Sequence, residues 1–379
     1  MLCIFRSLYI YIIPRIPFVR YPSNSFHSIL FFRFHPFDLR RGPICRILVA
    51  LFAAGILLSG CGSDDGSESV TVSETIRTSL HGTTHGIEYW YASEQGGFQG
   101  ITNIPYENLD CKNCHVPADM CDTCHLPDFS APTDDRCLAC HGRQKLEQFL
   151  GFTDVHRSAG MECVDCHTHA QVHGDNKSYD SMFNGVLSLV DCTDCHAVDE
   201  LSANPAHDSH GNKLHCTACH MQATVTCYNC HFESALEGNG KVPYGAFADW
   251  RFLVKWRDQV HQGNILTSTY QGQSFMAIAP FSGHSVYVPP SGYEICHDCH
   301  DNQMVQEYHN QGTMTITWWD AVDAEVEHFP GVIPVPKDWQ TAFKLTYVTL
   351  DQAGDWVVVN NDADLKQMLF CEPLDNLPE

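Results

Sequence analysis

The sequence predicts a mostly irregular fold with short α-helices, followed near the C-terminus by a small region that contains a β-hairpin. Two observations support this prediction. The pattern Cys-x-x-Cys-His occurs eight times, and seven copies fall within residues 111–231. Residues 341–360 alternate apolar and polar side chains on either side of an Asp-Gln-Ala-Gly-Asp turn, which is typical of paired strands. About seventeen residues per copy are too few to give each copy its own hydrophobic core.

Residues 1–60 have the features of an export segment. Arg40, Arg41 and Arg46 precede an apolar run over residues 47–58, which is too short to span a membrane as a mature helix. The run ends in Leu-Leu-Ser-Gly-Cys, which resembles a bacterial lipobox with Cys61 as the acylated first mature residue. An ordinary cleavage site or an N-terminal anchor helix is the alternative. Residues 1–39 lack any periodicity and are interpreted as an over-extended gene start.

The charge balance argues against a nucleic-acid partner. Loss of residues 1–60 removes seven of 22 basic and one of 45 acidic residues, leaving 15 against 44 and a net charge of −29. Such a surface repels phosphate backbones and favours cationic partners, metal ions or basic redox proteins.

The repeated pattern indicates covalently attached haem. In Cys-x-x-Cys-His, the two thiols form thioethers to a c-type haem and the adjacent histidine binds its iron. The expected attachment residues are Cys111, Cys114, Cys121, Cys124, Cys137, Cys140, Cys163, Cys166, Cys192, Cys195, Cys216, Cys219, Cys227, Cys230, Cys296 and Cys299. The expected proximal iron ligands are His115, His125, His141, His167, His196, His220, His231 and His300.

Zinc sites, disulfides and redox dithiols are the competing interpretations of these cysteines. A zinc site built from cysteine pairs has no need for a histidine directly after every pair, and one active dithiol suffices for exchange chemistry. Every Cys-x-x-Cys in this chain is followed by histidine. We therefore expect eight c-type haems, whose stacked faces replace a conventional core in residues 111–231.

Each iron needs a second axial ligand if it is to be coordinatively saturated. The candidates are the remaining histidines of the mature chain: His81, His85, His156, His169, His173, His207, His210, His215, His261, His284, His297, His309 and His328. Met161 or Met221 is the alternative at one haem, where methionine would raise the potential.

The mature chain divides into five segments. Residues 61–110 form a lipid-anchored tether and N-terminal segment, residues 111–231 carry seven haems, and residues 296–312 carry the eighth. Residues 232–295 are a haem-free insert, and residues 313–379 are a β-containing C-terminal cap.

Within the insert, residues 247–261 predict an amphipathic helix with Trp250, Leu253, Val254 and His261 on one face. This helix either packs on a haem or presents His261 to an iron. Arg251, Lys255 and Arg257 form a basic cluster on it, which either pairs with haem propionates or is a solvated face.

The C-terminal region has two interpretations. Its hairpin forms either a docking or polymerising edge or a lid over the last haem. Cys371 has no evident partner once Cys61 is acylated, so we expect a free thiol or an intermolecular link.

Taken together, Cys61 and residues 111–300 resemble the outer-membrane lipoprotein multihaem c-type cytochromes of dissimilatory metal-reducing bacteria. The resemblance implies the multihaem cytochrome c fold class, with short α-helices around a stacked haem core, and electron transfer in anaerobic respiration. It also implies partners among other redox proteins, metal oxides or soluble metal ions, and a membrane contact through the lipid anchor at the periplasmic or cell-surface side. No residue is then catalytic. The alternatives are an octahaem oxidoreductase acting on a small nitrogen or sulfur species at one open haem, and a subunit of a cytochrome filament.

Overall fold

The computed structural model describes residues 75–109, 121–181, 183, 190–197, 205–238, 240–289, 293–359 and 365–377. Residues 1–74 and the first attachment unit, residues 111–115, lie outside the described residues, and so do the export segment and the lipidation site predicted at Cys61. Among the described residues, no helix combines the length and apolar character needed to cross a bilayer.

Six of the seven described attachment units begin in a short helix. These elements are α5 (Cys121–Cys124), α6 (Asp134–Leu138), α9 (Cys163–Cys166), η4 (Cys192–Asp194), α13 (Cys216–His220) and α15 (Tyr293–His300). In the units at Cys121, Cys137, Cys163 and Cys192, the histidine N–H donates to the carbonyl of the first cysteine at 2.8–2.9 Å. One turn of helix brings the two cysteines, three residues apart, to the same face. The short helices expected at these units are therefore confirmed.

Further short helices connect the units. Before them come α2 (His85–Tyr91), η1 (Ser93–Gln95), α3 (Gln99–Thr102) and η2 (Tyr106–Asn108). Between and after them come α7 (Gly142–Phe149), α8 (Val155–Ser158), α10 (His169–His173), α12 (Pro205–Asp208), η5 (Gly211–Lys213), α14 (Phe232–Leu236) and α16 (Gln303–Gln311). Side chains of Asp154, Thr168 and Asn302 cap α8, α10 and α16 by accepting from backbone N–H groups of the first turn.

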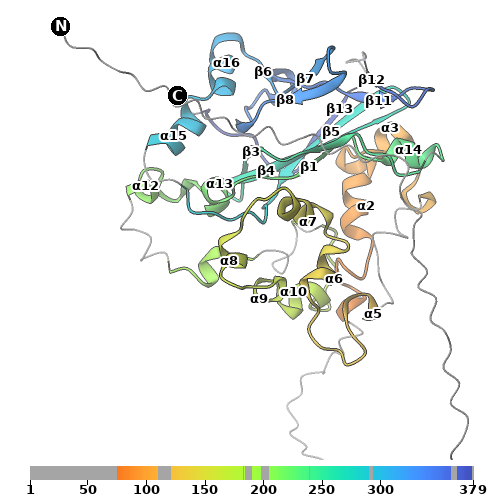
Figure 1. The fold of residues 1–379 in the computed structure, drawn as a ribbon, viewed down its shortest axis with the longest axis vertical. Coiled ribbons are helices and arrows are strands. Elements are labelled where there is room, and N and C mark those ends of the chain that lie inside the picture. Colours follow the sequence, from red (N-terminus) through yellow and green to blue (C-terminus); the bar gives the residue numbers. More distant parts are fainter. Residues whose placement is uncertain are drawn as a thin grey trace, which may run out of the picture. The chain divides into compact units, whose positions relative to one another are not determined.

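A five-stranded sheet lies beside these helices, in the order β13-β5-β4-β3-β9. Its strands are β3 (Trp250–Trp256), β4 (Gln259–Tyr270), β5 (Gln273–Pro280), β9 (Gly331–Pro334) and β13 (Lys366–Leu369). Strands β3, β4 and β5 are antiparallel neighbours, while β9 and β13 run parallel to β3 and β5. Figure 1 shows helices α5 to α10 on one side of this sheet and strands β6 to β8 on the other.

The amphipathic helix predicted over residues 247–261 is wrong, because this segment forms β3, a tight turn and the start of β4. Residues 250–254 are all buried, so both faces of β3 are covered. A strand buried on both sides carries apolar residues on both faces, so its period of two is hard to tell from a helical stripe. Arg257 and Asp258 both have positive φ, 51° and 63°, as the two-residue turn of a β-hairpin requires.

Smaller sheets complete the C-terminal half. They pair β1 (Thr226–Tyr228) with β2 (Gly245–Phe247), β6 (Met314–Thr315) with β10 (Phe343–Lys344), β7 (Thr317–Asp320) with β8 (Glu325–His328), and β11 (Val348–Leu350) with β12 (Trp356–Val358). The predicted hairpin is confirmed for β11 and β12, where Leu350 faces Trp356. At the start of the predicted segment, α17 (Trp339–Ala342) replaces the first expected strand residues.

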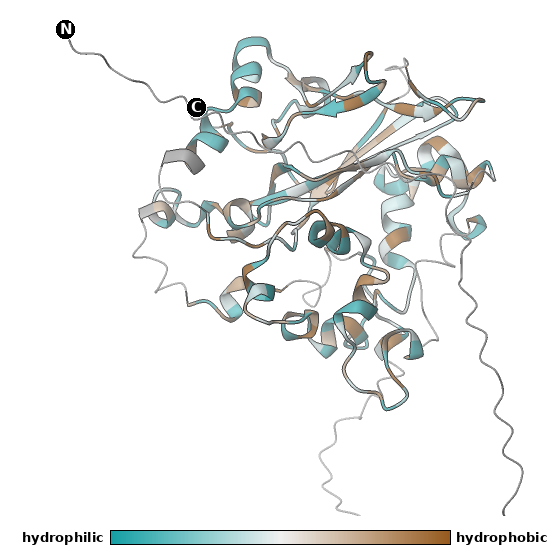
Figure 2. Ribbon diagram, in the orientation of Figure 1, coloured by the Kyte–Doolittle hydropathy of each residue, from teal (hydrophilic) through white to brown (hydrophobic). Residues whose placement is uncertain are grey.

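The sheets enclose a protein core of ordinary type. Tyr228, Trp250, Phe252 and Ile278 are fully buried in one cluster that joins the large sheet to the C-terminal strands. In Figure 2 the strands of the large sheet carry hydrophobic stretches, whereas α16 is mostly hydrophilic. Residues 226–369 therefore have a packed core of their own side chains, which the sequence analysis did not predict.

Candidate functional site

The attachment units are numbered first to eighth in chain order, beginning at Cys111, Cys121, Cys137, Cys163, Cys192, Cys216, Cys227 and Cys296. At six of them, the unit's histidine faces a second histidine from elsewhere in the chain. The distances between ring centres are 5.8 Å for His125 and His173, 6.1 Å for His141 and His81, 6.0 Å for His167 and His284, 6.0 Å for His196 and His156, 6.1 Å for His220 and His207, and 6.0 Å for His300 and His210.

This repeated spacing fits a metal ion between two axial imidazoles. Histidine nitrogens bind first-row metals at about 2 Å, so rings on opposite sides of one ion have centres about 6 Å apart. Rings in direct contact are closer, such as 4.1 Å between the stacked rings of His215 and His261 and 4.0 Å between His169 and His173. The six pairs thus keep the separation that an iron with two histidine ligands needs.

Burial favours the neutral form at several of the paired histidines. Burial is the largest cause that lowers the pKa of His81, His141, His167 and His173, and repulsion by neighbouring imidazoles adds to it at His81, His167 and His173. The pKa of His284 falls to about 4 for the same reasons. A neutral ring offers its lone pair without first losing a proton.

The thiols of the described units remain available for attachment. All fifteen described cysteines are free, including Cys371. Across the part of the chain that the structure describes, no three His, Cys, Asp or Glu side chains gather around one point where a metal could sit. The arrangement is one of opposed histidine pairs next to free cysteine pairs, whereas a structural zinc site gathers four ligands around one ion.

Proximity in sequence is a poor guide to these pairs. His156 comes shortly before the fourth unit but faces His196 of the fifth. His210 comes shortly before the sixth unit but faces His300 of the eighth. His173 follows the fourth unit but faces His125 of the second. The pairs form through tertiary contacts, so the sequence supplied the candidates without the assignments.

Other predicted distal candidates have different described contacts. The Nδ1 atom of His85 lies 3.3 Å from Ser178 Oγ, and His215 Nδ1 lies 2.9 Å from Thr217 Oγ1. His261 packs edge-on against Trp256, and burial lowers its pKa to about 4. His297 contacts Asp301, His309 contacts Tyr308, and His328 contacts Asp249.

The seventh unit is built differently from the others. It starts in β1, and the N–H of Cys230 donates to the carbonyl of Thr267 in β4 at 3.1 Å. The carbonyl of His231 accepts from Ser234 Oγ at 2.9 Å as α14 begins. Burial raises the pKa of Cys230 to about 12. This unit is therefore packed against the sheet.

The three cations expected on one helix face are divided along β3 and the turn that follows it. Arg251 is buried, and its Nη1 donates to the carbonyl of Met221 at 2.9 Å, beside the sixth unit. Lys255 pairs with Glu372 at 3.2 Å and Asp375 at 3.1 Å, while the guanidinium of Arg257 lies 4.3 Å from the centre of the Trp256 ring.

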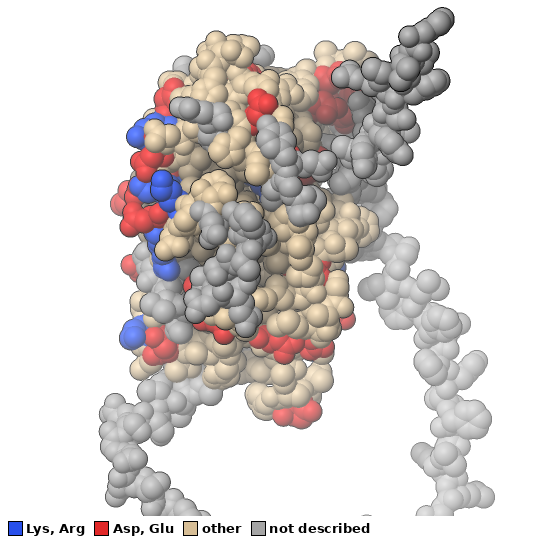
Figure 3. Space-filling model, turned by 90° about the vertical axis from the view of Figure 1, so that its left-hand side faces the viewer, with Lys and Arg blue, Asp and Glu red and all other residues tan. Residues whose placement is uncertain are grey.

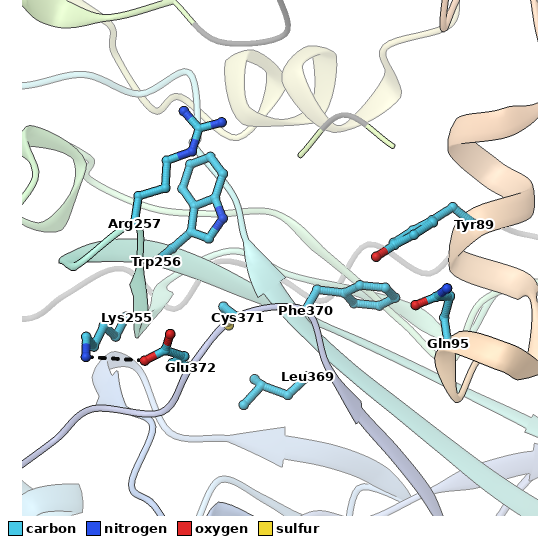
Figure 4. A pocket seen from close by; sticks show the side chains of 9 residues that line it. All are labelled: Tyr89, Gln95, Lys255, Trp256, Arg257, Leu369, Phe370, Cys371 and Glu372. Atoms are coloured by element: carbon cyan, nitrogen blue, oxygen red, sulfur yellow. Dashed lines mark ion pairs between the residues drawn. The ribbon is translucent and has the colours of Figure 1, made fainter. Parts of the chain in front are cut away.

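Lys255, Trp256 and Arg257 line an open pocket of about 370 Å³ together with Tyr89 and Phe370 (Figure 4). Cys371 also lines this pocket, and burial raises the pKa of its thiol to about 12. The predicted cluster of three cations is thus split between this pocket and the neighbourhood of the attachment units.

Comparisons with protein-family models, with curated proteins and with solved structures found no match to this chain.

Proposed function

We propose that this protein transfers electrons along eight covalently bound c-type haems, in respiration to metal or other external acceptors at the outer membrane. The observation that carries this proposal is the recurrence of one histidine-pair geometry at six attachment units, with ring centres 5.8–6.1 Å apart. Each pair includes the histidine that directly follows two free thiols.

The residues of this chain hold and tune the redox groups. The two cysteines of each unit would form thioethers, and the paired histidines would bind the iron from its two sides. A haem held in this way supplies an iron that cycles between Fe(II) and Fe(III). Haems held by these residues would supply one-electron chemistry, in which one group loses the electron that its neighbour gains and no bond is made or broken. Where two histidines would hold each group, no position would be left for a substrate, which favours electron transfer over substrate conversion.

Two features of the chain support a place at the bacterial surface. Cys61 follows an export segment that resembles that of bacterial lipoproteins, so we propose a lipid anchor there. The surplus of acidic residues favours ferric states and attracts cationic donors or metal ions. If Cys61→Ser left the protein fully in the membrane fraction, lipid anchoring would be excluded as its main attachment.

The test is an EPR spectrum of the purified ferric protein, with haem counted as the pyridine haemochrome. Eight haems with only low-spin signals are expected if every iron has two strong ligands. Fewer haems would contradict the attachment proposal. A high-spin signal equal to about one haem per chain would instead favour an oxidoreductase with one open iron, and nitrite, hydroxylamine, sulfite and tetrathionate would then be tested as substrates.

A further inference from the structure

The histidine pairs are joined to one another by hydrogen bonds and shared apolar contacts. The second and third units are joined first, where Arg136 Nη1 of α6 donates to the carbonyls of Asp122 and Thr123 in α5, both at 3.3 Å. The guanidinium therefore fixes the two short helices side by side.

One carboxylate joins the third unit to the fourth. Asp134, at the start of α6, accepts from the N–H of Cys163 at 2.8 Å through Oδ1, while Oδ2 pairs with Arg157. Asp134 is thus a positioning residue that holds the first turn of the fourth unit against the helix of the third.

A second carboxylate joins the fourth unit to the fifth. Asp154 Oδ1 accepts from the N–H of His156 at 2.8 Å, and Oδ2 accepts from the N–H of Val286 at 2.9 Å. His284, two residues before Val286, faces the fourth unit, while His156 faces the fifth. The same side chain therefore sets the positions of both distal histidines.

The fifth, sixth and eighth units complete the series. The side chains of Cys192 and Cys216 are neighbours, and Asp191, next to Cys192, is likewise a neighbour of His215, next to Cys216, so the fifth and sixth units lie together. His207 and His210 lie one helical turn apart and face His220 of the sixth unit and His300 of the eighth.

Apolar packing confirms the last of these contacts. Ala218 of the sixth unit and Cys299 of the eighth pack in one cluster with Leu253 of β3. The eighth unit therefore lies next to the sixth, although the seventh unit and the whole insert separate them in sequence.

Building on the proposed function, we propose that the second, third, fourth, fifth, sixth and eighth units form one continuous electron path in that order, with the seventh unit outside it. The seventh unit is held by β4 and α14, and the series of contacts from the second unit to the eighth is complete without it. Electrons passing between the two ends would cross the fifth unit and bypass the seventh.

The test follows one electron from end to end. Phe129, which is 70% exposed shortly after the second unit, is replaced by Cys in a Cys371→Ser background and labelled with a ruthenium-bipyridine photoreductant. His210→Ala opens the iron of the eighth unit, so that carbon monoxide binds there once the iron is ferrous. A flash excites the ruthenium label, which gives one electron to the haem of the second unit and is then reduced again by ascorbate. The carbon monoxide band reports arrival of the electron at the eighth unit.

The labelled protein with His210→Ala is the parent for two deletions, which test whether the path includes the fifth unit and excludes the seventh. Removing the fifth attachment (Cys192→Ala with Cys195→Ala) is expected to abolish the fast carbon monoxide signal. Removing the seventh (Cys227→Ala with Cys230→Ala) is expected to leave it. A fast signal that survives the first deletion, or is lost with the second, overturns the path, provided that each variant has one haem fewer than the parent and unchanged circular dichroism.

If the fifth-unit deletion does not fold, a less disruptive variant tests the same step. His156→Met keeps the haem of that unit and raises its potential, so the electron should be trapped there and arrive late. An unchanged arrival time would overturn the path. If the parent itself lacked eight haems or their low-spin signals before His210→Ala was introduced, the proposed function would fail instead.

Discussion

The backbone around His284 is held by two buried carboxylates. Glu147 is 1% exposed, and its Oε2 accepts from the N–H of His284 at 2.7 Å. Asp154 Oδ2 accepts from the N–H of Val286 two residues later. Because these acids fix the loop, the imidazole of His284 stays opposite His167 without relying on a regular helix or strand.

We expect His284→Ala to leave every haem attached but to convert one iron to high spin, because the thioethers of the fourth unit are untouched while its distal ligand is lost. EPR of the ferric protein measures this change. The matched control is His309→Ala, since His309 lies on α16 next to Tyr308. An unaltered spectrum for His284→Ala, or a high-spin signal for His309→Ala, would contradict the assignment of His284.

Local sequence identifies one half of each ligand pair. The histidine of every attachment unit follows from the pattern itself, since it directly succeeds the second cysteine. The opposing histidine does not, because His81 and His284 reach His141 and His167 through chain folding. Thirteen candidates were evident from the sequence, and no short-range signal selected among them.

Another histidine is held by an acid. His328, at the end of β8, pairs with Asp249, which directly precedes β3, and stacks on Phe247 at 4.2 Å between ring centres. Burial alone would raise the pKa of Asp249, but the hydrogen bond and charge of His328 outweigh it and hold the pKa below its usual value. The pair therefore ties β8 to β3 only while Asp249 is ionised.

Asp249→Asn should lower the free energy of unfolding at neutral pH by about 0.5–1 kcal/mol, a modest amount because the aspartate is partly exposed. An acid with a lowered pKa stabilises the fold above its unfolded-state pKa and loses that contribution as pH falls through the folded-state value. The difference between variant and wild type should therefore shrink as the pH falls through the lowered pKa of Asp249. Urea unfolding at neutral and at acidic pH measures this difference in the free energy of unfolding, with Asp323→Asn in the exposed β7–β8 turn as control. A difference independent of pH would contradict the ion pair.

At the scale of elements, β3 shows why the insert was misassigned. Trp250, Phe252, Val254 and Trp256 recur at every second position, the period of a strand. Leu253 lies at an intervening position and also fits a helical stripe, which made the period of the strand harder to recognise. The β11–β12 hairpin was predicted correctly because its alternation is regular and its turn contains Gly354, where φ is +85°.

The turn between β3 and β4 allows a test in which the direction of the stability change depends on whether this segment is a hairpin or a helix. Asp258 has a φ of 63°, so Asp258→Gly should raise the free energy of unfolding by about 1 kcal/mol, since glycine avoids the left-handed cost. In a helix the same change would lower it slightly, by about 0.3 kcal/mol, because aspartate and glycine are both poor helix formers. Chemical denaturation distinguishes the two outcomes.

The turn between β4 and β5 provides a control in which glycine is replaced instead of introduced, so the opposite change in stability is expected. Gly272, between β4 and β5, has a φ of 79°, and the space around its missing side chain is open. Gly272→Ala should therefore destabilise the sheet through backbone strain alone, by about 1 kcal/mol. Stabilisation by Gly272→Ala, or destabilisation by Asp258→Gly, would count against the hairpin geometry.

For the molecule as a whole, the two halves of the chain differ in how they are packed. Strands β3, β4 and β5 and the C-terminal strands enclose a core of their own side chains, while α5 to α10 are single or double turns. The density of attachment units in residues 111–231 was evident from the sequence, but the sheet was not. Its outer strands β9 and β13 come from segments far along the chain, and no local pattern pairs them with β3 and β5.

The charge of the whole molecule leads to the last prediction. Figure 3 shows acidic side chains scattered over one face, with basic ones gathered at one edge. The chain carries 45 acidic against 22 basic residues, so its field should attract cations and repel anions over roughly a Debye length, about 10 Å at 0.1 M salt. Stopped-flow oxidation of the reduced protein by hexaammineruthenium(III) should therefore slow as salt is raised, by about tenfold between low and high ionic strength. Oxidation by ferricyanide should accelerate. A common salt response for both reagents would show that the acidic surface lies away from the site where electrons leave, and the cationic partner proposed for this protein would then have to dock through contacts other than charge.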